Sequence, residues 1–323
     1  MPNDIYVDAA VSGNRAEPMK AILKTGFLAL AIMLALAVPA HAGPLEDGKV
    51  AYESKDYATA LKFWRPLAEQ GHPGAQTGLG IMYAKGHGVS QDFAEAAKWF
   101  QKAAEQGLGW AQYQLAAMYF KGQGVRQDDA EAVEWLQKAA EWGIPKAKTD
   151  LGFMYAKGRG VPQSYAEAMK WYRRAAEQGV AQAQHNLGYF FEKGLGVPQD
   201  NAEAVKWYRK AAEHGYASAQ VNVGIMYNNG RGVTRDHAEA LKWYRKATEQ
   251  GNAQAQYNLG LMYAAGEGVP QDDAAAHMWF TLAIQHGLKE AQTSRDILVK
   301  RMTHGQIEKA RLMAREWLAQ HPQ

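Results

Sequence analysis

The sequence predicts an all-α fold, a right-handed α/α superhelical solenoid of helix-turn-helix repeats. Two periodic series of residues support this prediction. Tryptophan recurs after 35 residues once and then after 36 residues five times, at Trp64, Trp99, Trp135, Trp171, Trp207, Trp243 and Trp279. A Gly-x-Gly-Val sequence keeps the 36-residue period through six copies, from Gly86 to Val269. A fixed period of this length with helical patterning is typical of solenoids, in which each unit buries its apolar face against its neighbours.

Residues 1–42 are predicted to be an upstream extension and a signal peptide rather than part of the fold. A run of twelve apolar residues, Phe27 to Val38, follows two lysines and precedes an Ala-x-Ala site that ends at Ala42. This order is typical of a secretory signal peptide, with cleavage after Ala42. The run is too short for a transmembrane helix, which needs about 20 apolar residues. Since acidic residues precede the lysines, we expect Met19 to be the true start.

The first full repeat, residues 69–104, shows why each unit is expected to contain two helices. Its first half places four apolar residues on one helical face: Ala75, Leu79, Met82 and Tyr83. Gly86 follows and offers the left-handed conformation that ends many helices. Asp92 and Glu95 then form an N-cap and its partner at the third helical position. The second half has its own apolar face: Ala96, Trp99, Phe100, Ala103 and Ala104.

The first helix of each repeat keeps one small residue at its middle. The six positions are Gly80, Ala116, Gly152, Gly188, Gly224 and Gly260. Glycine inside a helix costs about 1 kcal/mol relative to alanine. Its recurrence therefore predicts that a neighbouring helix approaches closely at this point.

The two ends of the array differ from its middle, as the caps of a solenoid must. Residues 43–68 are predicted to form an N-terminal capping half-repeat with a shorter turn. Residues 69–284 form six repeats of 36 residues. Residues 285–323 form a degenerate repeat followed by an amphipathic closing helix, expected over Gln306 to Gln320.

Twelve positions of the first full repeat define the repeated pattern: Ala75, Gln76, Leu79, Gly80, Met82, Tyr83, Gly86, Gly88, Val89, Asp92, Ala96 and Trp99. The pattern resembles the Sel-1-like repeat, a relative of the tetratricopeptide repeat, throughout residues 69–284. Departures are minor: Phe190 and Phe191 replace Met and Tyr in the fourth copy. The resemblance implies an α/α superhelix that acts as a scaffold or adaptor, and that in bacteria is often exported.

Signatures of catalytic and metal sites are missing from the sequence. There is no cysteine, which excludes thiolate chemistry and the lipid-attachment cysteine of a lipoprotein. None of the six serines lies in a nucleophile elbow or three residues before a lysine. No two of the ten histidines are three or four residues apart, and the Gly-x-Gly turns follow helices rather than strands. We therefore expect no enzyme, cofactor or metal, although a cell-wall or β-lactam hydrolase remains an alternative because carboxylates are abundant.

Basic residues recur in threes on the second helix of the third, fourth and fifth repeats. They are Lys170, Arg173 and Arg174, then Lys206, Arg209 and Lys210, then Lys242, Arg245 and Lys246. They could form a stripe for an acidic partner or a solvated outer face. We favour the outer face, because a glutamate lies three residues before the first lysine of each triplet and late-helix cations suit the helix dipole. The formal net charge of only +3 also gives no reason to expect nucleic acid.

The predicted partner site consists of residues that vary while the framework stays fixed. On the first helix of each repeat, three positions lie opposite the Leu and Met stripe, where related solenoids line a concave groove. The candidate partner-binding residues there are Tyr113, Phe120, Phe153, His185, Tyr189 and Tyr257. Aromatic side chains supply large contact area at low entropy cost. The alternative is that they pack between successive repeats.

The sequence thus predicts a non-enzymatic scaffold that binds a protein or peptide through its concave surface. We expect it in the periplasm or outside the cell, with no membrane span in the mature chain and no nucleic-acid partner. A periplasmic regulator of a membrane sensor is a further alternative, which shares the same binding physics and differs in its partner.

Overall fold

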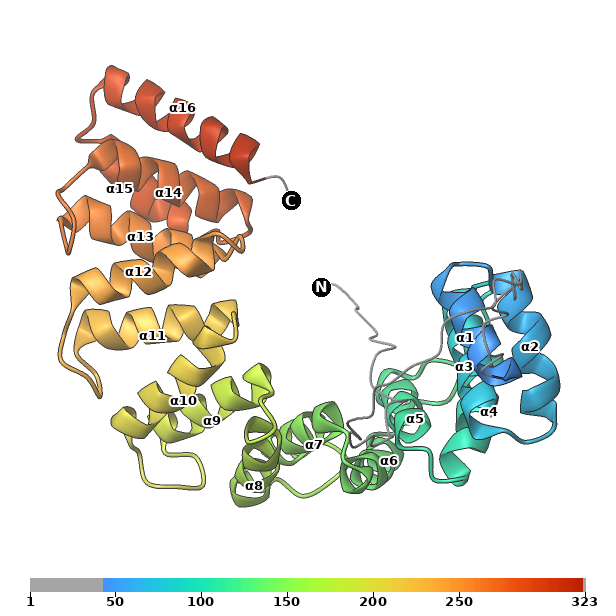
Figure 1. The fold of residues 1–323 in the computed structure, drawn as a ribbon. Coiled ribbons are helices and arrows are strands. Elements are labelled where there is room, and N and C mark those ends of the chain that lie inside the picture. Colours follow the sequence, from blue (N-terminus) through green and yellow to red (C-terminus); the bar gives the residue numbers. More distant parts are fainter. Residues whose placement is uncertain (1–42, 322–323) are drawn as a thin grey trace, which may run out of the picture. The chain divides into compact units, whose positions relative to one another are not determined.

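The computed structural model describes residues 43–321. The predicted signal peptide, the start at Met19 and the cleavage site after Ala42 lie outside these residues. Over the described range the chain forms sixteen helices and no strand (Figure 1). The prediction of an all-α repeat solenoid is confirmed. The chain divides into two compact units, one ending at Trp142 and one beginning at Gly143.

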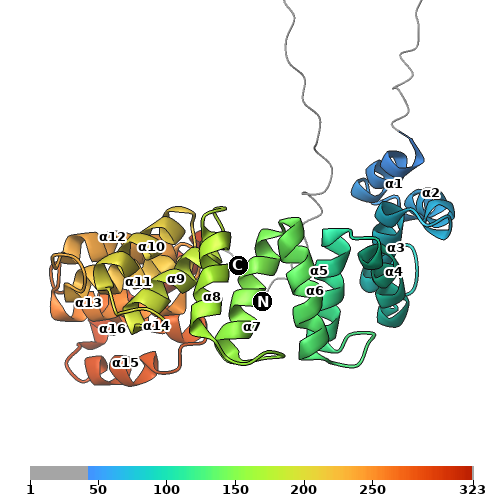
Figure 2. The same cartoon turned by 90° about the horizontal axis from the view of Figure 1, so that it is seen from below.

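The first unit contains three antiparallel helical pairs. The helices are α1 (Pro44–Glu53), α2 (Tyr57–Glu69), α3 (Pro73–Lys85), α4 (Phe93–Glu105), α5 (Gly109–Lys121) and α6 (Asp129–Trp142). Figure 2 shows α5 and α6 side by side as one such pair. The segment predicted to be a half-repeat holds a complete pair, α1 and α2, joined by a short turn in which Lys55 has a φ of 64°.

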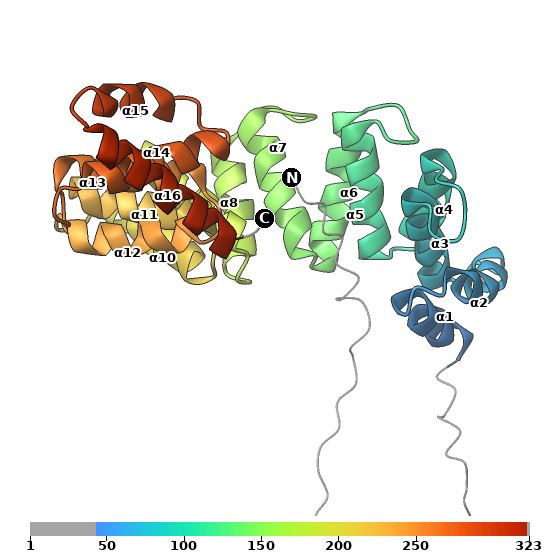
Figure 3. The ribbon, with the colours of Figure 1, turned by 90° about the horizontal axis from the view of Figure 1, so that it is seen from above.

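The second unit contains four further pairs and two closing helices. The helices are α7 (Pro145–Lys157), α8 (Tyr165–Ala176), α9 (Ala181–Lys193), α10 (Asn201–Glu213), α11 (Ala217–Asn229), α12 (His237–Thr248), α13 (Ala253–Ala265), α14 (Asp273–Gln285), α15 (Ala291–Val299) and α16 (His304–Gln320). Both closing helices pack against α14, and Figure 3 shows α16 lying across it. Trp317 of α16 meets Trp279 of α14 edge to face, with ring centroids 5.9 Å apart. This contact covers the last apolar face of the array.

The core of each pair is built from the predicted stripes. In the first full repeat Ala75, Leu79 and Met82 of α3 are buried, and so are Phe100 and Ala103 of α4. The tryptophans lie nearer the surface, since Trp99, Trp135, Trp171, Trp207 and Trp279 are half-buried. Small alanines therefore bring the helices together, while one large residue per helix fills the space between them.

The mid-helix glycines are explained by an aromatic ring from the partner helix. A Cβ atom at Gly260 would lie 2.5 Å from the Phe280 ring, and one at Gly152 would lie 2.7 Å from the Tyr172 ring. In the second repeat, where Ala116 replaces glycine, the matching position of α6 is Leu136 rather than an aromatic residue. Close approach of the neighbouring helix, predicted from sequence, is confirmed.

The glycines of the Gly-x-Gly turns are required by the conformation and close packing of the backbone. Gly122, the C-cap residue of α5, adopts the left-handed conformation with a φ of 66°. Gly124 also has a positive φ, and a Cβ atom there would collide with the backbone carbonyl of Phe93 at the start of α4. The second glycine is therefore needed because the turn of one repeat lies directly on the preceding repeat.

The second helix of each full repeat begins at the predicted cap. Asp200, for example, accepts a hydrogen bond from the backbone N–H of Glu203, at 2.9 Å. The Glu203 carboxylate in turn pairs with Lys206, at 2.8 Å, and the same glutamate-lysine pair recurs on α4, α8 and α12. The third-position glutamate thus stabilises the first turn through its lysine. Asp272 caps α14 without such a glutamate by accepting from two backbone N–H groups.

Candidate functional site

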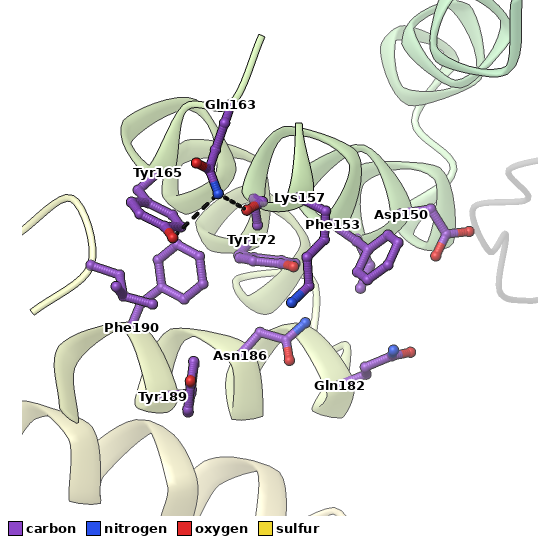
Figure 4. A pocket seen from close by; sticks show the side chains of 13 residues that line it. Asp150, Phe153, Lys157, Gln163, Tyr165, Tyr172, Gln182, Asn186, Tyr189 and Phe190 are labelled. Atoms are coloured by element: carbon purple, nitrogen blue, oxygen red, sulfur yellow. Dashed lines mark hydrogen bonds between the residues drawn. The ribbon is translucent and has the colours of Figure 1, made fainter. Parts of the chain in front are cut away.

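A pocket of about 420 Å³ lies among α7, α8 and α9 in the second unit (Figure 4). The helix α7 begins the third full repeat and α9 begins the fourth, so the pocket lies between the first helices of consecutive repeats. Six lining side chains give it its chemistry: Phe153, Lys157, Tyr165, Gln182, Asn186 and Tyr189. Pockets of this size that combine aromatic and polar groups are typical ligand sites.

Two predicted partner-binding residues, Phe153 and Tyr189, lie in this pocket. They occupy the same position of consecutive repeats, on α7 and α9. Their side chains are among the most exposed large apolar groups of the described chain, at 37% and 43% of their full accessibility. Tyr165, at the start of α8, adds a third exposed ring at 36%. The structure thus brings together three aromatic faces that the core does not bury.

A buried tyrosine forms the floor of the pocket. The Tyr172 hydroxyl lies near Asp150 and Asn186, and burial together with the Asp150 charge raises the pKa of Tyr172 far above its usual value. The hydroxyl therefore remains protonated at any physiological pH. At one edge, Gln163 donates from Nε2 to the Ala156 carbonyl at 2.9 Å and to the Tyr165 hydroxyl at 3.3 Å. This glutamine holds the Tyr165 ring at the rim.

Two other predicted residues lie between repeats. The Nε2 atom of His185 is 3.1 Å from Nδ2 of Asn222 on α11, and the imidazole packs against the rings of Tyr208 and Tyr216. The Tyr257 hydroxyl is 3.1 Å from the Ser294 hydroxyl on α15. His185 and Tyr257 therefore make contacts between successive repeats, which is the alternative that the sequence analysis left open.

The remaining two predicted residues, Tyr113 and Phe120, lie in the first unit on α5. Both are half-buried. The Tyr113 ring meets the Trp110 ring edge to face, with centroids 5.8 Å apart. These residues belong to a different unit from Phe153 and Tyr189, and they do not line the pocket.

Three positions of each first helix were expected to line the groove, and in the third repeat all three, Thr149, Phe153 and Ala156, line the pocket. Of these positions, only the one occupied by Phe153 and Tyr189 is exposed in both repeats, since Thr149, Ala156 and Glu192 are buried. Asp150, Lys157, Gln182 and Asn186 line the pocket as well. The 36-residue recurrence of asparagine at 186, 222 and 258 was an available signal for this face.

A buried carboxylate lies beside the pocket, on α9. Glu192 accepts a hydrogen bond from the Tyr208 hydroxyl at 2.8 Å and forms ion pairs with Lys193 at 3.2 Å and Arg231 at 3.0 Å. Burial raises the pKa of Glu192, but these hydrogen bonds and positive charges outweigh it and hold the pKa below its usual value. Glu192 therefore stays ionised, and Lys193 and Arg231 neutralise its charge. The contact with Arg231 links the fourth repeat to the fifth.

The basic triplets of the second helices have partners within the chain. On α10, Lys206 pairs with Glu203, Arg209 hydrogen-bonds the Tyr227 hydroxyl, and the Lys210 ammonium lies 4.1 Å from the centre of the Trp207 ring. The same cation-aromatic contact recurs with Trp99, Trp135, Trp171 and Trp243. A hollow of about 380 Å³ lies over α10, and Glu213 lines it together with this triplet. The contacts favour a solvated outer face over an anion site.

The histidines at helix ends are structural. Gln184 donates from Nε2 to the Ala176 carbonyl of the preceding repeat, at 3.1 Å. Its Oε1 atom lies 3.1 Å from Nδ1 of His214. His286 meets Gln256 in the same way, at 2.7 Å. Among residues 43–321 no cluster of three or more His, Asp or Glu could hold a metal ion. Within that range, every helix falls short of the length and hydropathy that crossing a bilayer requires.

The lining of the pocket supplies several kinds of binding group. It offers aromatic faces for stacking, one ammonium, one carboxylate, and amides that can both donate and accept hydrogen bonds. Such a combination of groups can select a ligand by its shape and by the placement of its charges.

Comparison with known proteins gives a consistent result. A family model described as "Sel1 repeat" matches residues 43–72, 73–108, 111–143, 145–180, 181–216, 217–252 and 253–288. A Sel1 repeat protein from Oxalobacter formigenes is 35% identical, with a TM-score of 0.69, over 75% of this chain and 97% of its own. A second similar structure is c5321, a protective antigen of uropathogenic Escherichia coli with an SLR fold. It is 29% identical, with a TM-score of 0.52, over 86% of this chain and 77% of its own. No curated protein matches.

Proposed function

Because this chain belongs to the Sel1 repeat family, we propose that it is an exported, non-enzymatic adaptor that binds a partner protein through the α7–α9 pocket. Proteins of this family generally act as scaffolds for protein-protein interaction. The observation that carries the assignment to this pocket is the exposure of Phe153 and Tyr189, which line it from equivalent positions of two consecutive repeats.

The solvent exposure of these aromatic rings argues for a binding role. Large exposed aromatic groups do not stabilise a solenoid core, and they increase the risk of aggregation. Aromatic residues at interfaces are frequent binding hot spots, because they bury much area with few rotatable bonds. The neighbouring seam, between α9 and α11, is closed by the contact of His185 with Asn222. The α7–α9 seam instead contains the pocket, which supports it as the place where a partner inserts.

Export is the second part of the proposal. The apolar run at 27–38, the lysines before it and the Ala-x-Ala site support a cleaved signal peptide and a periplasmic or extracellular location. The similar protein from uropathogenic E. coli is described as a protective antigen, which is compatible with an exported protein. A protein exported in this way meets little nucleic acid, and its formal net charge is only +3, so no nucleic-acid partner is proposed.

Photo-crosslinking in the producing cell tests this function. A benzophenone amino acid placed at 153 or at 189 is expected to give the same covalent adduct. The same group at Lys242, an exposed position on α12, is expected to give none. Replacement of Phe153 and Tyr189 together by alanine should abolish co-purification of that partner while the circular dichroism spectrum stays helical. Equal adducts at all three positions would remove the assignment to this pocket.

A further inference from the structure

Lys157, in the last turn of α7, supplies an ammonium group to the pocket. Figure 4 shows its side chain directed from the end of α7 toward Asn186 on α9. Within the part of the chain that the structure describes, Lys157 has no ion pair and no hydrogen bond. Lys193, at the same position one repeat later, pairs with Glu192 at 3.2 Å. In the repeat of Lys157 the equivalent of Glu192 is Ala156, so the charge is left for another partner.

The charge of the second unit has the same sign as this group. Residues 143–323 contain 23 lysines and arginines against 17 aspartates and glutamates, a formal charge of +6. Residues 43–142 contain 10 against 13, a formal charge of −3. A surface of positive net charge attracts acidic segments and raises their rate of association. A basic segment would meet repulsion from the net charge of the unit and from Lys157.

The pocket also carries opposite charges at two points along α7. Asp150 and Lys157 lie seven residues apart on α7, which places their backbones about 10 Å apart along the helix axis. Phe153 lies between them on the same helix, and Tyr189 lines the pocket from α9. An apolar group seated on these rings therefore has a positive charge on one side and a negative charge on the other. Such an arrangement selects the direction in which a chain can bind.

We propose that the pocket binds a segment of a partner protein that carries a large apolar side chain next to an aspartate or glutamate. The apolar side chain seats against Phe153 and Tyr189, and the carboxylate pairs with the Lys157 ammonium. The amides of Asn186 and Gln182 hydrogen-bond the backbone of the segment. This inference rests on the proposed function, whose partner it defines chemically.

A neutral glycan is the main competing occupant, because aromatic faces and amides also bind sugar rings. Two observations favour the acidic segment. A neutral sugar makes no use of the Lys157 ammonium, which has no ion pair or hydrogen bond among the residues that the structure describes, and it gains nothing from the formal charge of +6. The glycan is therefore an outcome of the test and not the proposal.

Display selection with random 12-residue peptides on the purified protein tests the inference. Selected peptides are expected to share a large apolar residue with an acidic residue at a fixed spacing. Their affinity should fall about tenfold in Lys157→Glu, which corresponds to about 1.4 kcal/mol, and should weaken when NaCl is raised from 50 to 300 mM. Lys121→Glu is the matched control, since Lys121 ends α5 at the same repeat position outside this pocket. It should change the affinity less than twofold.

Three results would overturn the inference: enrichment of neutral or basic peptides, absence of any enriched peptide, or equal affinities for Lys157→Glu and the unmodified protein. Binding of neutral cell-wall or plant oligosaccharides that Phe153→Ala abolishes and Lys157→Glu leaves intact would assign the pocket to glycans. The proposed function fails separately. If crosslinks at 153 and 189 capture a partner that still binds Lys157→Glu, the adaptor role stands and only the acidic character of the partner is wrong.

Discussion

The Tyr208 hydroxyl donates a 2.8 Å hydrogen bond to the buried carboxylate of Glu192. The glutamate side chain is only 10% exposed and also pairs with Arg231 of the following repeat. Replacement of Glu192 by alanine would leave the hydroxyl and the guanidinium without their acceptor. The Arg231 side chain is 43% exposed and water can solvate it, so the main cost is the buried hydroxyl left without its acceptor, and we expect Glu192→Ala to lower the free energy of unfolding by about 1 to 3 kcal/mol.

Glu203→Ala provides the comparison for that measurement. Glu203 lies on the surface of α10, where its ion pair with Lys206 is solvated. Loss of such a pair costs no more than about 1 kcal/mol. Urea titration followed by circular dichroism should separate the two variants clearly. Equal destabilisation would mean that the Glu192 network contributes no more than a surface pair.

The glycine at 260 is predicted to be required by the ring at 280. Alanine would favour the helix by about 1 kcal/mol, but its Cβ atom would lie 2.5 Å from the Phe280 ring. We expect Gly260→Ala to destabilise the protein by about 1 to 3 kcal/mol, because overpacking outweighs helix propensity. Thermal unfolding measures the change.

The second repeat shows how this clash is relieved, since it carries Ala116 opposite Leu136. Gly260→Ala combined with Phe280→Leu should therefore be more stable than the sum of the single variants predicts. A double-mutant cycle gives the coupling energy. If the two changes are simply additive, the ring does not set the requirement for glycine.

Stability is expected to fall as the pH drops from 7.5 to 5.5. Burial lowers the pKa of His185, against smaller opposing effects of a neighbouring amide and of Glu192. The groups that face the imidazole, Tyr208, Tyr216 and Asn222, are neutral. A histidine held neutral in the folded state contributes fully above its unfolded pKa near 6.5, and that contribution is lost as the pH falls toward the folded value.

His185→Gln should therefore flatten the dependence of the melting temperature on pH across this range. Part of the dependence should remain, because burial also lowers the pKa values of His87, His277 and His286. His304→Gln, on the exposed start of α16, should leave the profile unchanged. An identical slope for His185→Gln and the unmodified protein would contradict the prediction.

The framework could be predicted from sequence because it repeats. The glycine at 86, the caps such as Asp200 and the apolar stripes each recur at 36 residues, so a single error in one copy is corrected by the others. The partner site lacks this redundancy. Position 185 has threonine, tyrosine, histidine and valine as its equivalents, and its role depends on which neighbour is present in the next repeat.

The helical face that lines the pocket is wider than the three positions chosen from sequence. A helix with a Leu and Met stripe has its opposite side defined only to within one residue, about 100° of rotation for each position. Thr149 and Ala156 line the pocket although they are buried, and Asp150 and Lys157 line it as well. The contact between repeats that decides this is not encoded in the periodicity of any single helix.

The last prediction separates the pocket from the basic outer face. Replacement of Lys206, Arg209 and Lys210 by glutamine removes one surface ion pair and two contacts of a cation with an aromatic ring. We expect a loss of about 1 to 2 kcal/mol in the free energy of unfolding. Partner binding should not change, because from Asp200 to Glu213 the three acidic residues balance the three basic ones. Crosslinking yield at position 189, measured in the triple variant and in Phe153→Ala, checks both expectations. Loss of the adduct in a triple variant that remains folded would move the binding surface to the second helices.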